Sequence, residues 1–107
     1  MNYTKVLEKI AIFFNQFTKH YYQKDEILIR AGENPVGVFY LEKGYVRQYA
    51  ISEKGEEITF NLYKPQTFFP MMWVLNDTPN NYYFEAAAAS TVFIAPKEKV
   101  VAFVKNE

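Results

Sequence analysis

The sequence predicts a mainly β protein, an antiparallel sandwich or barrel with a helix at each end of the chain. Aromatic residues make up 19% of the 107 residues, including nine Tyr and ten Phe, and these residue types favour strands. Short apolar runs begin near residue 26, and turn-like clusters separate them about every ten residues, a spacing typical of such folds. The clusters occupy residues 31–35, 43–44, 52–55, 64–67 and 76–81. A chain of this length is expected to form one domain with a single core.

Residues 3–17 show the periodicity of an amphipathic helix. Leu7, Ile10, Phe14 and Phe17 follow one another at steps of three, four and three residues, which places them on one face. We expect this face to pack on the β core of the same domain. Binding of a partner is the less common use of such a face.

The segment 57–63 shows the clearest strand alternation in the chain. Ile58, Phe60 and Leu62 fall on one face, and Thr59 and the other residues between them fall on the opposite face. Because one face is largely apolar, we expect that face to belong to the core.

Two Lys-Gly pairs, at 43–44 and 54–55, predict tight turns. In each pair Gly follows a polar residue, where a hairpin requires a positive φ that a side chain would disfavour. We therefore expect two successive hairpins.

The last third of the chain predicts a turn, two strands and the start of a helix. Residues 79–81 have the composition of a turn, and residues 82–88 follow as a strand. A short strand over 92–95 then leads to Pro96, which suits the first position of a helix. We expect that helix to begin within 96–107.

The overall composition excludes several classes of protein. Lys plus Arg and Asp plus Glu both number 12, so the chain lacks the excess of basic residues that binds nucleic acid through phosphates. The absence of Cys excludes disulfides, thiolate zinc sites and cysteine-ligated iron-sulfur clusters. Glu8 and Lys9 interrupt the apolar N-terminal residues, so we expect neither a signal peptide nor a membrane span. We expect a cytoplasmic protein with no membrane partner.

The segment 62–89 is the strongest candidate for one wall of a ligand pocket. It holds the only Trp, two of the three Met and three of the five Pro, and between Pro65 and Leu75 it has no charged side chain. Met71, Met72 and Trp73 either line an apolar pocket or fill the space themselves. We favour filling, because aromatic and Met clusters most often belong to a core.

The order of elements and the glycine positions resemble a known domain. The matching features are Gly32-Glu33 after the first strand, Phe39-Tyr40-Leu41 followed by Gly44 and Val46, Gly55 with the strand ending at Leu62, and the segment KPQTFF at 64–69. Together they resemble the cyclic-nucleotide-binding domain of the Crp/Fnr family of bacterial transcription regulators, over about residues 17 to 104. In that family KPQTFF would lead into the phosphate-binding cassette.

The resemblance implies the architecture in more detail. A member of the family has a double-stranded β-helix, or jelly-roll barrel, with flanking N- and C-terminal helices. Residues 1–107 would form this single domain, with the first helix at about 3–17, the barrel at about 20–95 and the start of another helix at about 96–107. The family's dimerisation helix and DNA-binding domain would follow the barrel and would be absent from this chain.

The cassette itself departs from the family's pattern. The family uses a glycine-glutamate pair and, after a short helix and loop, an arginine to hold phosphate and ribose. Pro70 and Met71 stand at the glycine-glutamate positions here, and Asn80 or Asn81 stands where the arginine is expected. An anionic ligand would lose both its cation and its ribose acceptor, and desolvating an unpaired charge is costly. We therefore predict that cyclic AMP and cyclic GMP do not bind in the usual manner.

The candidate pocket residues come from this cassette and from one strand. They are Phe69, Pro70, Met71, Trp73, Asn80, Asn81, Tyr82 and Arg47. Arg47 is one of only two arginines and is included because an anion site would recruit one, although an exposed strand position is the more common role. Tyr82 and Tyr83 carry hydroxyls that face either a polar ligand or the surface. The single histidine, His20, is expected to pack or cap rather than to bind a metal.

Three functional hypotheses follow. The leading one is the sensory domain of a Crp/Fnr-like transcription regulator with an unknown small-molecule effector, a homodimer in its longer form, that contacts DNA only through another domain. The second is a stand-alone small-molecule-binding or purely structural barrel that uses the Trp73 region. The third, a cupin-type enzyme, is disfavoured because one His cannot supply the usual metal ligands. We find no catalytic constellation and expect no enzyme activity, no metal and no other cofactor.

Overall fold

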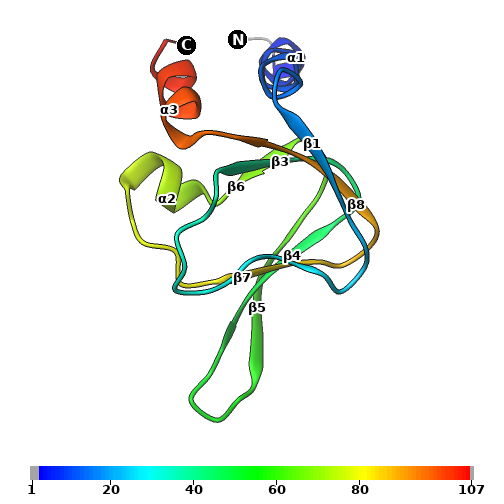
Figure 1. Ribbon diagram of the computed structural model, residues 1–107, viewed down its shortest axis with the longest axis vertical. Helices are drawn as coiled ribbons and strands as arrows, with labels where there is room; N and C mark the ends of the chain where they lie inside the picture. Colours follow the sequence, from blue (N-terminus) through cyan, green and yellow to red (C-terminus); the bar gives the residue numbers. More distant parts are fainter. Residues whose placement is uncertain (1–2, 107) are drawn as a thin grey trace.

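The computed structural model describes residues 3–106, which form two antiparallel four-stranded sheets and three helices (Figure 1). The helices are α1 (Tyr3–Phe14), α2 (Met71–Asn76) and α3 (Lys97–Lys105). The strands are β1 (Thr18–Tyr22), β2 (Ile27–Ile29), β3 (Val38–Lys43), β4 (Val46–Ile51), β5 (Glu57–Tyr63), β6 (Thr67–Phe69), β7 (Tyr83–Ala86) and β8 (Ser90–Ala95). The first sheet has the order β1-β8-β3-β6 and the second β2-β7-β4-β5. The predicted mainly β jelly-roll fold with flanking helices is confirmed.

The first sheet is the middle layer of the molecule and is buried on both faces. On β3, Val38 and Tyr40 pack toward α1 and α3, while Phe39 and Leu41 pack toward the second sheet. This explains why β3 is a continuous apolar run instead of an alternating one. Burial of each such large side chain stabilises the fold by about 1.5 to 3 kcal/mol.

Helix α1 packs on the core as predicted from its apolar stripe. The Phe14 ring stacks on Tyr40 with centroids 4.8 Å apart, and Phe13 stacks on Phe103 of α3 at 4.3 Å. The two helices lie side by side at one end of the molecule (Figure 1). Helix α1 ends three residues before the predicted boundary, because the chain must reach Thr18 in an extended form to pair with β8. Among residues 3–106, no helix combines the length and the apolar character that a bilayer crossing requires.

The prediction that one face of β5 belongs to the core is wrong. Ile58, Phe60 and Leu62 are 49%, 53% and 54% exposed. Strand β5 is the edge of its sheet, and its hairpin with β4 extends away from the body of the molecule (Figure 1). A register shift in the β4–β5 pairing also leaves Phe60 without a partner residue, so the three side chains do not share one face.

Other boundaries also differ from the prediction. Residues 18–22 form β1, so His20 lies within a strand, whereas we expected the first strand only from residue 26. Strand β7 covers 83–86 of the predicted 82–88, with Phe84 and Ala86 on its buried face. Pro96 is the residue before α3, and the predicted helix end at Glu107 lies outside the described residues.

Only one of the two predicted hairpins is present. Gly55 lies in the turn between the paired strands β4 and β5, whereas Gly44 connects β3 to β4, which belong to different sheets. The backbone at both positions has the predicted positive φ, +98° at Gly44 and +84° at Gly55. The surroundings differ: a Cβ on Gly44 would lie 2.2 Å from Ser90 Oγ, whereas a Cβ on Gly55 would have nothing within 4 Å.

We expect Gly44→Ala to destabilise the protein more than Gly55→Ala. Both substitutions strain a left-handed backbone position, at a cost of about 1 to 2 kcal/mol. The first also forces the chain apart at Ser90 and should lower the free energy of unfolding by about 1 to 3 kcal/mol more. Urea denaturation of both variants measures the difference, and equal losses would show that the close approach at Gly44 is relieved without cost.

Candidate functional site

A pocket of about 530 Å³ lies between the β4–β5 strands, α2 and the loop that follows α2. Its walls are formed by Gln48, Asn61, Tyr63, Pro70, Met71, Met72, Trp73, Thr78, Pro79, Asn80, Asn81, Tyr82 and Phe84. Six of the eight predicted site residues therefore meet around one hollow, namely Pro70, Met71, Trp73, Asn80, Asn81 and Tyr82. Their role in binding a ligand stays a prediction.

The inner end of the pocket is a stack of aromatic rings between the two sheets. Phe69 is fully buried, and its ring stacks on Phe84 at 5.0 Å and on Tyr63 at 5.1 Å. Phe84 and Tyr63 line the pocket, whereas Phe69 lies beneath them. Phe69 thus supports the wall that a ligand would meet, and the structure does not place it on the pocket surface.

The strand wall carries a hydrogen-bonded group of polar side chains. Gln48 on β4 and Asn61 on β5 are register partners, and Asn61 Nδ2 donates to Gln48 Oε1 at 3.1 Å. The Tyr63 hydroxyl donates to the same oxygen at 2.8 Å. Burial raises the pKa of Tyr63, so its hydroxyl is neutral at neutral pH. The wall presents amides and a hydroxyl, without a formal charge.

Helix α2 supplies the apolar wall, and here the preferred interpretation of its side chains is partly wrong. Met71 is 39% and Met72 58% exposed, so these side chains line the pocket instead of filling it. Trp73 is half-buried and packs against the core that α1 and α3 also cover. The physical reason is the position of α2, which lies beside the sandwich instead of between its sheets (Figure 1).

The loop after α2 is held by Asn80. Its side chain accepts from the Tyr82 backbone N–H at 3.2 Å and donates to the Tyr82 carbonyl at 2.9 Å. Its backbone carbonyl accepts from Gly32 N at 3.0 Å. Asn80 is 8% exposed, so its amide fixes the loop, while its neighbour Asn81 is exposed at the pocket.

Arg47 points away from the pocket, which corrects its inclusion in the predicted site. Gln48 lines the pocket, and adjacent strand residues face opposite ways. The guanidinium of Arg47 donates to Glu57 at 2.8 Å and to Glu85 at 3.0 Å, and it lies 4.0 Å from the centre of the Tyr49 ring. Burial alone would lower the pKa of Arg47, but the bonds to the two carboxylates raise it overall. A cation held in this way is not free to meet an anion in the pocket.

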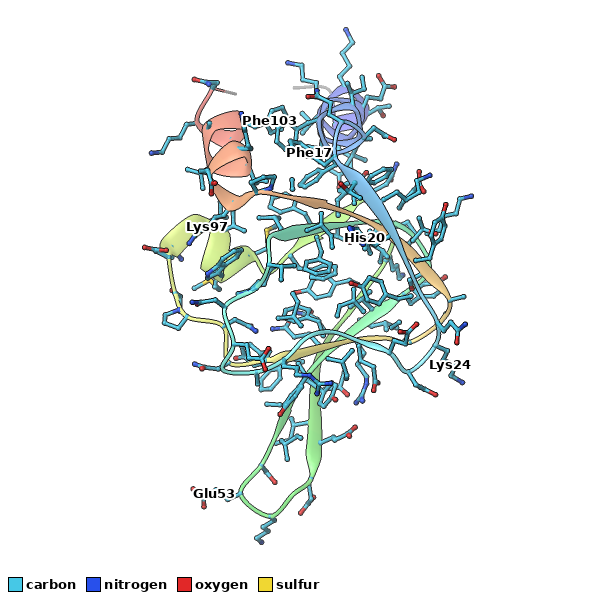
Figure 2. The ribbon with its side chains drawn as sticks, in the orientation of Figure 1. Phe17, His20, Lys24, Glu53, Lys97 and Phe103 are labelled. Atoms are coloured by element: carbon cyan, nitrogen blue, oxygen red, sulfur yellow. The ribbon has the colours of Figure 1, made fainter. Side chains whose placement is uncertain are left out.

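Lys97 connects α2 to the first turn of α3. Its ammonium lies 4.5 Å from the centre of the Trp73 ring and pairs with the carboxylate of Asp77, which follows α2. Figure 2 shows Lys97 beside α2. A hydrogen bond from Lys97, and then its charge, lowers the pKa of Asp77. Lys97 does not belong to the walls of the pocket, although it contacts a residue that does.

The strand wall is not among the features that the sequence predicts. Gln48, Asn61 and Tyr63 were not among the predicted site residues, and Met72 was considered only with its neighbours. The one available signal was an amide in each of two consecutive predicted strands. It does not identify a site without the register that pairs the two residues. In the described part of the chain, no group of three or more His, Asp or Glu side chains is placed to hold a metal ion.

The comparisons with known proteins agree with this geometry. Residues 19–107 match the family model of the cyclic nucleotide-binding domain. Among solved structures, the Thermus thermophilus catabolite activator protein aligns with a TM-score of 0.76 and 18% identity, covering 92% of this chain and 46% of that chain. The sensor domain of the transcriptional regulator DNR from Pseudomonas aeruginosa aligns at 0.76 and 20% identity, covering 88% and 63%. The EAL enzyme Bd1971 in its cAMP-bound form aligns at 0.74 and 21%, covering 84% and 24%.

These similarities concern the fold. The chain spans less than two thirds of each of these structures and less than half of the catabolite activator protein. No curated protein sequence matches this chain closely enough to count as a relative.

We expect the Lys97→Met substitution to raise the pKa of Asp77 toward the ordinary aspartate value of about 4. The pKa of Asp77 is lowered in the folded protein, so the ion pair stabilises the fold at pH values above the unfolded-state pKa. That contribution disappears as the pH falls through the folded-state pKa. Carboxyl ¹³C NMR titration of Asp77 measures the change. Lys99→Met, which removes an exposed lysine two residues further along, is the matched control and should leave Asp77 unchanged.

Proposed function

Since this chain belongs to the cyclic nucleotide-binding domain family, we propose that it is the sensory domain of a Crp/Fnr-like transcription regulator that responds to an uncharged small molecule. Cyclic nucleotides would not bind it in the usual manner. The proposal assigns the pocket residues a binding role and gives the chain itself no catalytic one.

The observation that carries this proposal is the chemistry of the pocket walls. The thirteen residues that line it include amides, a threonine, aromatic rings, prolines and two methionines, and no Asp, Glu, Lys, Arg or His is among them. A phosphate that left water for this pocket would lose its hydration without gaining a counter-charge, which is strongly unfavourable. A neutral ligand has no such cost.

Two basic side chains that adjoin residues of the pocket wall support the same conclusion. Arg47 lies on the opposite face of its strand between two carboxylates, and Lys97 pairs with Asp77. Recruiting either cation to an anionic ligand would first break an existing ion pair. Release of Arg47 would also leave Glu57 and Glu85 without their shared partner, and unpaired like charges are mutually repulsive.

The regulator part of the proposal extends beyond this domain. The aligned structures include a catabolite activator protein and the sensor domain of a transcriptional regulator, and this chain covers 46% of the first. In a longer form we expect a homodimer in the cytoplasm whose DNA contacts come from another domain. The effector would act by favouring one of two arrangements of that dimer, which requires different affinities for the two.

We expect titration calorimetry of this chain with cyclic AMP and cyclic GMP, at millimolar excess, to give no saturable heat. The reason is the absence of a counter-charge on the pocket walls of the described chain. The EAL enzyme Bd1971, whose structure is known in a cAMP-bound and in a cGMP-bound form, is the positive control. Saturable heat with micromolar affinity would contradict the proposal. If that heat disappeared in Arg47→Met, Arg47 would be the cation responsible.

A further inference from the structure

The two amides on the strand wall leave one donor and one acceptor unused. Gln48 Oε1 already accepts two hydrogen bonds, from Asn61 Nδ2 and from the Tyr63 hydroxyl. Within residues 3–106, no hydrogen bond uses Gln48 Nε2 or Asn61 Oδ1. The pair therefore offers an N–H from Gln48 and a carbonyl oxygen from Asn61, on two side chains that are joined by a hydrogen bond.

These two atoms remain accessible from the pocket. Both residues belong to its walls, Asn61 is exposed, and no unpaired polar side-chain atom of the described residues is buried. Their positions are also fixed. The two strands are paired at this point, and the Tyr63 hydroxyl restrains the Gln48 amide from the aromatic stack. A donor and an acceptor on two hydrogen-bonded neighbours can together recognise one edge of a ligand, as the few polar groups of small-molecule sites do.

The other amides on the walls are less suited to this role. The Asn80 side chain uses both its donor and its acceptor on the backbone of Tyr82. Asn81 is exposed on the loop, and no side-chain hydrogen bond within residues 3–106 orients its amide. Gln48 and Asn61 are thus the oriented polar pair of the pocket.

The remaining walls favour a flat apolar ring. Met71 and Met72 present polarisable side chains from α2, and methionine sulfur makes favourable contacts with aromatic rings. The Tyr82 ring is held edge-on by Phe60 with centroids 5.0 Å apart. The volume of about 530 Å³ lies within the range of pockets that hold one drug-sized molecule.

We propose that the pocket selects an uncharged, flat heteroaromatic molecule with a lactam edge, meaning a ring N–H beside a ring carbonyl. The ring carbonyl would accept from Gln48 Nε2, and the ring N–H would donate to Asn61 Oδ1. This inference rests on the proposed preference for a neutral ligand and adds the class of ligand and the two residues that read it.

The test uses three bicyclic probes of nearly equal shape. 2-Quinolone carries the lactam edge, N-methyl-2-quinolone lacks the donor, and naphthalene lacks both groups. Binding is followed by the ¹³C-methyl NMR signals of Met71 and Met72. We expect 2-quinolone to bind at least about tenfold more tightly than either other probe, because each of those leaves a polar group of the wall without its partner.

A specificity reversal separates recognition from a merely structural effect. In Gln48→Glu the carboxylate can still accept from Asn61 and Tyr63, but it offers an acceptor where the wild type offers an N–H. We expect this variant to bind 2-quinolone about tenfold or more weakly than the wild type does. We expect it to bind 2-aminoquinoline more tightly, because the amino group and the protonated ring nitrogen of that probe both donate hydrogen bonds. Gln16→Glu, the same chemical change on the exposed residue after α1, should keep the wild-type preference.

The outcomes distinguish this inference from the proposed function. If the wild-type protein binds all three probes with equal affinity, or does not bind 2-quinolone at millimolar concentration, the lactam assignment is wrong. The proposed preference for an uncharged ligand would be unaffected. The wild-type comparison decides the matter even if Gln48→Glu fails to fold. Micromolar binding of cyclic AMP or cyclic GMP would instead contradict the proposed function itself.

Discussion

The stack of aromatic rings between the two sheets is the contact on which core and pocket both depend. Phe39 and Phe69 come from the first sheet, and Tyr63 and Phe84 come from the second. Phe69 and Phe84 are almost parallel, with an angle of 5° between their planes. Aromatic side chains bury about 150 to 250 Å² each, so this group is a large part of the force that joins the sheets. Because Tyr63 and Phe84 also line the pocket, the pocket cannot shift without disturbing the core.

Much of the fold could be predicted because the relevant signals are local. The turn clusters, the positive φ at Gly44 and Gly55 and the apolar stripe of α1 are each set by a few neighbouring residues. Strand β5 shows where this reasoning fails. Its alternation is the pattern of a half-buried strand, but burial depends on what lies across from it. At the edge of a projecting hairpin, Ile58, Phe60 and Leu62 remain about half exposed.

The candidate site also has one part that a single segment of sequence indicates and another part that depends on strand pairing. Nine of its thirteen wall residues lie between 70 and 82, and the six that were predicted all come from this one segment. Gln48 and Asn61 are thirteen residues apart and meet only through the β4–β5 register, which a bulge shifts by one residue. The same register decides the role of Arg47. Once Gln48 faces the pocket, its neighbour must face outward, where Glu57 and Glu85 hold it.

Basic side chains beside the uncharged pocket are paired with carboxylates of the same chain. The formal net charge is zero, and two cations that adjoin residues of the pocket wall are already paired, Arg47 with two carboxylates and Lys97 with Asp77. Ion pairs that remain partly accessible to solvent contribute little stability individually. Under the proposed function their effect on specificity would be larger, because an anionic ligand would have to compete with a carboxylate that is already in place. The proposed neutral ring would meet no such competitor, and its recognition would then depend on the few donors and acceptors of the strand wall.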